Sequence, residues 1–409
     1  MTRIAVRDAL LDAQVLRAAG SAPYGGADLG ECLATARRVR GTGLGSWHDA
    51  WAAAAASARA LGEAELAAGR TETARLAFFR SASYDRTAGV MLLGGPVNGR
   101  QAGGGPADGR LAAAYGRQTE TFRRGAALLA RPPEIVSIPY QGTTLPGYFF
   151  RSSDEVGPAV ILTGGYDGTA EELYFFNGAA ALARGYHVLA FDGPGQGTAL
   201  LGQGLVLRPD WENVISPVLD WLLAQPGVDP ARVALIGLSL GGYLAPRAAS
   251  AEHRLAACVA DCGSYDLFAS ALTRVPGPLA AGFEAGRPRP TAMLGRILDF
   301  VARQPTGGWA LRRGQQVHGA TGPLAYLGAL REYTLAGRAG QIRCPTFVGN
   351  AEGDDISASA PQLAAALTCP REFVTFTAAE GAGDHCEAGA RTLFHARMFA
   401  WLDQILHPR

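Results

Sequence analysis

The stretch Val233-Ala234-Leu235-Ile236-Gly237-Leu238-Ser239-Leu240-Gly241-Gly242 places a serine between two glycines directly after an apolar run. Residues 232–236 are predicted to form a strand and residues 240–250 a helix, so the serine stands at a strand-to-helix turn. Because glycine has no Cβ, strand and helix can approach closely while the serine adopts a strained backbone and exposes its Oγ. This pattern is typical of a nucleophile elbow. The alternative is an ordinary glycine-rich turn, since the chain contains 54 glycines.

A serine hydroxyl needs a base that removes its proton before it can attack a carbonyl carbon. The histidines that lie well downstream of the serine are His318, His385, His395 and His407. His385 is the predicted base, because it lies in a glycine-rich loop (380–387) between a predicted strand (372–377) and a predicted C-terminal helix (391–406). We expect His395 and His407 to be structural or solvated. His318 is expected at the surface of a cap, with a substrate contact as the alternative.

The carboxylate that orients the base is expected at the end of the preceding strand, residues 344–350. Asp354 and Asp355 both follow this strand. The usual distance between strand and acid favours Asp354, and Asp355 stays open as the alternative. Glu352 and these aspartates could also form an acidic metal loop, but no His or Cys ligand pattern accompanies them. We therefore predict no metal site.

Two backbone N–H groups are expected to bind the oxyanion that forms during attack on a carbonyl. One is Leu240 N–H, directly after the nucleophile, and the other is Tyr166 N–H, in the loop after a predicted strand at 160–163. In the same loop, Gly165 and Asp167 are candidate substrate contacts, while a plain tight turn is the alternative. The run 188–197 has neither the order nor the spacing of a nucleotide-binding fingerprint, so no cofactor is predicted.

Composition and charge narrow the class of protein further. With 409 residues, 48% hydrophobic residues and a net charge of +1, the chain is expected to be a soluble globular protein with no affinity for nucleic acid. Residues 1–19 are amphipathic rather than a signal peptide, and no apolar stretch is long enough to span a membrane. Six scattered cysteines are typical of buried free thiols in a cytoplasmic protein. Cys386 could also tune the site or react, because it follows the predicted base.

The order of predicted elements indicates two parts. Residues 1–130 are helical, with periodic segments at 47–62, 70–93 and 107–129 and a flexible glycine-rich connection at 94–105. Residues 131–409 alternate strands and helices, which predicts a doubly wound, mostly parallel α/β sheet. After the sixth predicted strand (257–261), an insertion at about 264–340 is expected to form a cap, with helical segments at 293–303 and 324–336.

Four segments of the chain carry a resemblance to a known family. They are Gly164-Gly165-Tyr166-Asp167-Gly168-Thr169-Ala170-Glu171-Glu172, Phe191-Asp192-Gly193-Pro194-Gly195-Gln196-Gly197, Gly237-Leu238-Ser239-Leu240-Gly241-Gly242, and Phe376-Thr377-Ala378-Ala379-Glu380-Gly381-Ala382-Gly383-Asp384-His385-Cys386. In these segments the chain resembles the α/β-hydrolases grouped with 2,6-dihydroxypseudooxynicotine hydrolase, the FrsA-like enzymes and the polyketide-shortening hydrolases. More weakly, the resemblance extends over most of the chain.

The resemblance implies an α/β-hydrolase fold in which Ser239, Asp354 and His385 form the catalytic triad, in the chain order Ser, acid, His. Some members of this group cleave a carbon–carbon bond beside a ketone, with an extra carboxylate from the region after strand six. Asp266 is the nearest candidate for that carboxylate here. A helix N-cap explains Asp266 equally well.

These expectations combine into a serine hydrolase that acts on a small-molecule carbonyl substrate, by carbon–carbon or ester hydrolysis. A composition rich in Ala, Gly and Arg suggests a GC-rich genome, in which tailoring of a secondary metabolite is a plausible role. The alternatives are an acyltransferase or cyclase with the same triad, and a non-catalytic ligand-binding protein. The Ala-rich helices of residues 1–130 are expected to mediate a homodimer.

Overall fold

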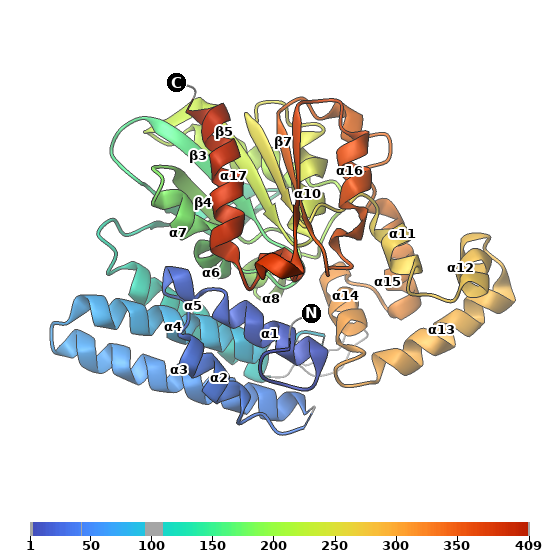
Figure 1. Ribbon diagram of the computed structural model, residues 1–409, viewed down its shortest axis with the longest axis horizontal. Coiled ribbons are helices and arrows are strands. Elements are labelled where there is room, and N and C mark those ends of the chain that lie inside the picture. Colours follow the sequence, from blue (N-terminus) through green and yellow to red (C-terminus); the bar gives the residue numbers. More distant parts are fainter. Residues whose placement is uncertain (1–2, 42, 95–108, 408–409) are drawn as a thin grey trace.

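The computed structural model describes residues 3–41, 43–94 and 109–407, and an eight-stranded sheet forms its centre (Figure 1). The order of the strands across the sheet is β1-β2-β4-β3-β5-β6-β7-β8. Their bounds are β1 Glu134–Tyr140, β2 Thr143–Phe150, β3 Gly157–Thr163, β4 His187–Phe191, β5 Val228–Leu238, β6 Ala257–Asp261, β7 Thr346–Ala351 and β8 Arg371–Phe376. The pairs β1–β2 and β2–β4 are antiparallel, and all other pairs are parallel. The predicted mostly parallel sheet is confirmed, and the loops after β3, β5, β6, β7 and β8 all leave from one edge.

Helices cover both faces of the sheet, as buried parallel strands require. One face packs against α9 (Glu212–Leu223), α10 (Gly241–Ala249) and α16 (Ala360–Ala366). The other face packs against the short helices α6 (Ala170–Leu173) and α7 (Ala179–Leu182), joined by a π-helical turn, and against α17 (Arg391–Leu406). In Figure 1, α17 crosses in front of the strands. The short helix α8 (Gly197–Leu201) follows β4.

Five α-helices precede the first strand in the part of the chain that the structure describes. They are α1 (Ala9–Ala19), α2 (Leu29–Ala36), α3 (Leu44–Ala67), α4 (Thr71–Val90) and α5 (Gly109–Ala126), and Figure 1 shows them below the sheet. Trp47 and Trp51 of α3 are fully buried in an apolar core that these helices form apart from the two cores on the sheet. Phe79 of α4 and Phe122 of α5 pack in the same apolar cluster as Tyr148 of β2. Aromatic burial of this kind docks the helical region on one face of the sheet.

The cap predicted between strands six and seven is present as five helices. They are α11 (Leu267–Leu272), α12 (Gly277–Glu284), α13 (Pro288–Ala302), α14 (Trp309–His318) and α15 (Pro323–Ala329). In Figure 1, α12 and α13 extend away from the body of the molecule. Helix α14 returns to the N-terminal helices, where Trp309 is buried and its indole N–H donates to the Val90 carbonyl at 3.0 Å. The cap therefore contacts both the helical region and the sheet edge.

Most predicted elements lie within a few residues of the observed ones. The segments predicted at 47–62 and 70–93 are α3 and α4, and the C-terminal helix agrees with α17 at both ends. Most of the connection predicted at 94–105 lies outside the described residues. Among the residues that the structure describes, no helix is both long enough and apolar enough to cross a membrane.

Arg391, at the start of α17, is fully buried and ties this helix to the sheet edge. Its guanidinium pairs with Asp261 at 2.8 Å and Glu387 at 3.3 Å, and it donates to the Asn177 amide oxygen at 2.7 Å. Burial, followed by the nearby Asp261 carboxylate, raises the pKa of Glu387 well above its usual range. Arg391 thus fixes the loop before α17 against the end of β6, because the buried Asp261 carboxylate needs its charge.

Replacing Arg391 with Ala should lower the free energy of unfolding by about 3–5 kcal/mol, because it leaves a buried carboxylate without a counter-charge. The matched control is Arg397→Ala on the same helix, whose ion pair with Glu380 lies at the surface. Urea unfolding followed by circular dichroism measures both variants. We expect a large shift of the midpoint for R391A and a small one for R397A, and equal shifts would contradict the role of Arg391.

Candidate active site

Ser239 follows the end of β5 with a backbone φ of +63°, in the left-handed region that side chains rarely adopt. The flanking glycines are required by the space available. A Cβ on Gly237 would lie 1.9 Å from the Gly241 carbonyl oxygen, and one on Gly241 would lie 2.6 Å from the Thr163 carbonyl oxygen. The turn therefore has the strained geometry and close approach of a nucleophile elbow.

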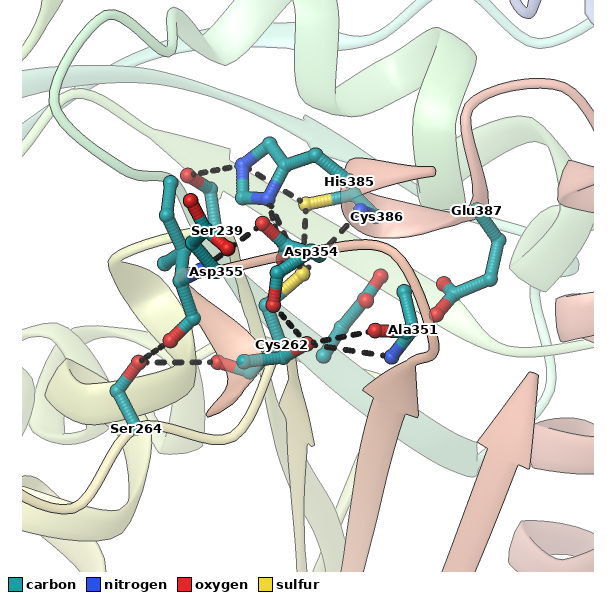
Figure 2. A network of polar contacts seen from close by, with 12 residues as sticks. Ser239, Cys262, Ser264, Ala351, Asp354, Asp355, His385, Cys386 and Glu387 are labelled. Atoms are coloured by element: carbon teal, nitrogen blue, oxygen red, sulfur yellow. Dashed lines mark hydrogen bonds and ion pairs between the residues drawn. The ribbon is translucent and has the colours of Figure 1, made fainter. Parts of the chain in front are cut away.

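His385 and Asp354 approach this serine from two other loops. His385 lies between β8 and α17, and Asp354 follows β7. The His385 Nε2 atom is 2.9 Å from the Ser239 Oγ, and its Nδ1 is 2.8 Å from an Asp354 carboxylate oxygen. Figure 2 shows the imidazole between the other two side chains. A continuous line of hydrogen bonds thus joins hydroxyl, imidazole and carboxylate.

The structure distinguishes Asp354 from Asp355, the two candidates for the carboxylate that orients His385. Asp354 is buried, and besides His385 it also accepts from the Ile356 amide. Asp355 is exposed, with a side chain 84% accessible, and lies 3.4 Å from the Arg274 guanidinium. Asp354, the residue that the sequence favoured, is therefore the one whose carboxylate lies within hydrogen-bond distance of the imidazole.

The charges of the pair favour the carboxylate and imidazolium forms. Burial alone would raise the pKa of Asp354, but His385 and the hydrogen bonds outweigh it and lower this pKa to about 2. Burial alone would lower the pKa of His385, but the Cys386 sulfur and the Asp354 carboxylate outweigh it and raise this pKa well above its usual range. The site can therefore stabilise a positive charge that forms on the imidazole.

The loop after β3 lies directly against the serine. A Cβ on Gly165 would be 2.8 Å from the Ser239 Oγ and 2.9 Å from the Leu240 amide nitrogen, so only glycine lets the chain pass here. Within the described residues, the amides of Leu240 and Tyr166 donate no hydrogen bond. Both amides thus have no acceptor among these residues; Leu240 directly follows the nucleophile, and Tyr166 follows the glycine that lies against it.

The two aspartates predicted to contact substrate differ in their surroundings. Asp167 borders the cavity described below and pairs with Arg17 at 2.9 Å. Asp266 is instead the N-cap of α11, where its carboxylate accepts from the Ala269 amide at 2.7 Å. It does not border the cavity. Of the two alternatives left open for Asp266, the structure therefore supports the N-cap, because helix capping occupies its carboxylate.

A cavity of about 460 Å³ lies next to Ser239 and His385, which form part of its wall. Its walls come from three parts of the chain, namely α1 (Ala13, Gln14, Arg17), the cap (Leu267, Trp309, Arg313, Tyr326) and the sheet edge (Tyr166, Ser239, Leu240, His385). The volume fits a small organic molecule, since ligand cavities commonly occupy several hundred cubic ångströms. Apolar and aromatic side chains make up most of the wall, and the charged residues on it are Arg17, Asp167, Arg274, Arg313, Asp354 and Asp355.

Two other histidines, His318 and His395, were also assigned from the sequence, and the structure shows where each of them lies. His318 packs among tyrosine rings and hydrogen-bonds the Tyr166 hydroxyl at 2.8 Å, so the surface position expected for it is wrong. Burial, followed by the Arg313 charge, lowers its pKa to about 4. His395 is fully buried between the Tyr24 hydroxyl and the Phe176 carbonyl, which confirms its structural role.

Two buried thiols lie beside the imidazole. The sulfurs of Cys262 and Cys386 are 3.3 Å apart, and each is 3.4 Å from one ring nitrogen of His385 (Figure 2). These three side chains could together offer ligands to a metal ion, a grouping that the sequence did not predict. The ring nitrogens already contact Ser239 and Asp354, so a metal would compete with both. All six cysteines are buried and free, as expected.

The sheet order, the elbow and the serine–histidine–aspartate geometry together define an α/β-hydrolase fold. Residues 159–395 match the model of the alpha/beta hydrolase family. The hydrolase acrC of Aspergillus aculeatus is 36% identical over 423 residues, covering 96% of this chain and 95% of the relative. The 20-hydroxy-prefusarin hydrolase FUS2 of Gibberella moniliformis is 34% identical over 410 residues, covering 95% of each chain. The chain belongs to the alpha/beta hydrolase family and is an enzyme of that family.

A solved structure has the same overall fold. The 2,6-dihydroxy-pseudo-oxynicotine hydrolase structure aligns with a TM-score of 0.72 and 23% sequence identity, over 95% of each chain. The likeness therefore includes the N-terminal helices and the cap. The group predicted from sequence motifs is confirmed at the level of fold and family.

The strained backbone at position 239 can be tested by measuring protein stability, without a substrate. Ser239→Gly should be more stable to urea than Ser239→Ala by roughly 1 kcal/mol, because only glycine adopts a φ of +63° without cost. At an ordinary exposed helical position the order reverses, and Ala53→Gly should destabilise by roughly 0.5–1 kcal/mol. A Ser239→Ala variant as stable as Ser239→Gly would show that the elbow is not strained.

Proposed function

We propose that this enzyme is a serine hydrolase that acts on a small-molecule carbonyl compound, with Ser239, His385 and Asp354 as its catalytic triad. The observation that carries the proposal is the line of hydrogen bonds from the Ser239 hydroxyl through His385 to Asp354, at 2.9 and 2.8 Å, beside a cavity of about 460 Å³. Nucleophile, base and orienting acid in this geometry are the groups that acyl transfer requires.

In the proposed reaction, the Ser239 Oγ attacks the carbonyl carbon while the His385 Nε2 accepts its proton. Asp354 holds the Nδ1–H and stabilises the imidazolium that forms. The amides of Leu240 and Tyr166 bind the negative oxygen of the tetrahedral intermediate. The imidazolium then gives its proton to the leaving group, and water activated by the neutral imidazole releases the acyl group from the serine.

The bond that is cleaved is proposed to be an ester or a carbon–carbon bond beside a ketone. Both routes begin with attack on a carbonyl and need the same oxyanion donors. The named relatives support a role in the tailoring of a secondary metabolite, since one of them acts on 20-hydroxy-prefusarin. A screen of aryl esters against 1,3-diketones distinguishes the two bond types.

Three further expectations from the sequence accompany this proposal. Residues 1–130 are proposed to form a helical domain, which together with the cap at about 264–340 covers the cavity. A homodimer and a cytoplasmic location stay predictions, the latter supported by the six free thiols. Light scattering of the full chain tests the dimer.

Replacing Ser239 with Ala should lower kcat on any cleaved substrate by several orders of magnitude, on the order of 10⁶, because the nucleophile is lost. Steady-state kinetics measures the loss, and the unfolding midpoint confirms that the variant is folded. Ser264→Ala is the control, since Ser264 is buried close by but bonds backbone carbonyls. Turnover of Ser239→Ala within tenfold of the wild type would remove the proposed mechanism.

The pH dependence of kcat/KM tests the roles of the two aspartates. The protonated imidazole cannot act as a base, so a raised pKa of His385 moves the acid limb above the usual histidine value of about 6.5. Asp354→Asn removes the carboxylate that favours imidazolium, so the acid limb should move to lower pH. The rate should fall by about 10⁴, as in other triads.

The matched control for this profile is Asp355→Asn, which removes the same charge from the exposed neighbour. Its acid limb and its rate should stay close to those of the wild type. Equal displacement of the limb in the two variants would show that Asp354 does not interact specifically with the base.

A further inference from the structure

Three guanidinium groups and two carboxylates gather where α1, α4 and the cap meet the loop after β3. Arg17 binds Glu172 through two hydrogen bonds, at 2.8 and 2.6 Å, and Asp167 through a third at 2.9 Å. Arg86 lies 3.5 Å from Asp167 and 3.3 Å from Glu172. These four side chains are well buried and neutralise each other in pairs.

Arg313, from α14 of the cap, is the third cation, and within residues 3–41, 43–94 and 109–407 it has no carboxylate of its own. Its guanidinium is 3.7 Å from Asp167, a carboxylate that Arg17 and Arg86 already hold. Within the described residues, its buried Nε atom has no hydrogen-bond partner. Among the residues that the structure describes, one positive charge is therefore left over, on a side chain that is only 14% exposed.

The position of Arg313 is fixed by two aromatic rings. Its guanidinium carbon lies 4.4 Å from the centre of the Trp309 ring and 4.7 Å from that of Tyr166. Cation–π contacts of this kind hold a guanidinium in place without using its N–H groups. Those N–H groups stay available, and a guanidinium presents them in the planar fork that matches a carboxylate.

Arg313 borders the same cavity as Ser239. Of the other cations on the cavity wall, Arg17 is held by Asp167 and Glu172. Arg274 is largely exposed and lies 3.4 Å from Asp355, so water screens its charge more than that of Arg313. Since most of the wall is apolar, an ionic contact inside the cavity is screened less than one in water.

We propose that Arg313 is a substrate-binding residue that takes a carboxylate, so that the substrate class is carbonyl compounds carrying a carboxylate away from the bond that is cleaved. The inference rests on the proposed function of the same cavity. It assigns a substrate specificity to the cap, through a residue that no catalytic motif contains. Three observations support it: the positive charge of Arg313 has no carboxylate of its own, its Nε has no hydrogen-bond partner, and the rings of Trp309 and Tyr166 hold its guanidinium in place.

The kinetic test compares p-nitrophenyl monoesters of succinic, glutaric and adipic acids with their methyl diester counterparts, which match them in shape but carry no charge. For at least one chain length, the wild type should favour the acid by about tenfold in kcat/KM, equal to 1.4 kcal/mol. Arg313→Gln should abolish this ratio, and Arg313→Lys should keep part of it. Arg296→Gln removes the same charge from an exposed site on α13 and should leave the ratio unchanged.

A binding test distinguishes failure of this inference from failure of the proposed function. Thermal unfolding of the Ser239→Ala protein is measured with added monomethyl glutarate or dimethyl glutarate, so that no turnover is needed. The acid should raise the melting temperature more than the diester does, and Arg313→Gln in the same background should remove the difference. If none of these esters is cleaved but this difference is seen, the proposal of ester hydrolysis fails and the carboxylate site stands. Equal effects of acid and diester, or an acid preference that survives Arg313→Gln, would overturn the inference.

Discussion

The contact between Asp354 and the Nδ1 of His385 is the interaction on which the rest of the site depends. It requires that two loops, 31 residues apart in sequence, end within 2.8 Å of each other. The parallel sheet makes this possible because β7 and β8 are neighbours whose carboxyl ends lie at the same edge. The buried Arg391 then fixes the loop that carries His385 against the end of β6. Without these constraints the imidazole would have no fixed orientation toward Ser239.

Three parts of the chain together form the walls of the cavity beside this contact. The sheet edge contributes Ser239 and His385, the first helix contributes Arg17, and the cap contributes Trp309 and Arg313. Reactive groups thus come from the sheet, while much of the opposite wall comes from helices. The relatives acrC and FUS2 match over about 95% of this chain, so the similarity includes all three parts. This division lets the cap and helices change specificity without moving the groups proposed to be catalytic.

Local sequence predicted those features that depend on local geometry. The elbow at Ser239 could be found because a strand, two glycines and a helix must stand together there, and His385 because it follows the last strand. Asp354 could be preferred over Asp355 only by its offset, since burial decides between them and burial depends on the whole fold. His318 was wrongly expected at the surface, because its contact with Tyr166 depends on how the cap packs against the loop after β3. For Asp266 the sequence could not decide between a substrate contact and the N-cap, because the cavity wall depends on the whole fold. Arg17 and Arg313 carry no motif, so the sequence alone could not place them at the cavity.

The measurement that tests the central claim most directly is peptide mapping by mass spectrometry after reaction with a fluorophosphonate. Such a reagent modifies a serine only where a neighbouring base makes its hydroxyl nucleophilic. The proposed chemistry predicts one adduct, on Ser239, that forms rapidly in the wild type and is lost in His385→Ala. An unmodified Ser239, or a Ser239 that reacts equally fast without His385, would contradict it.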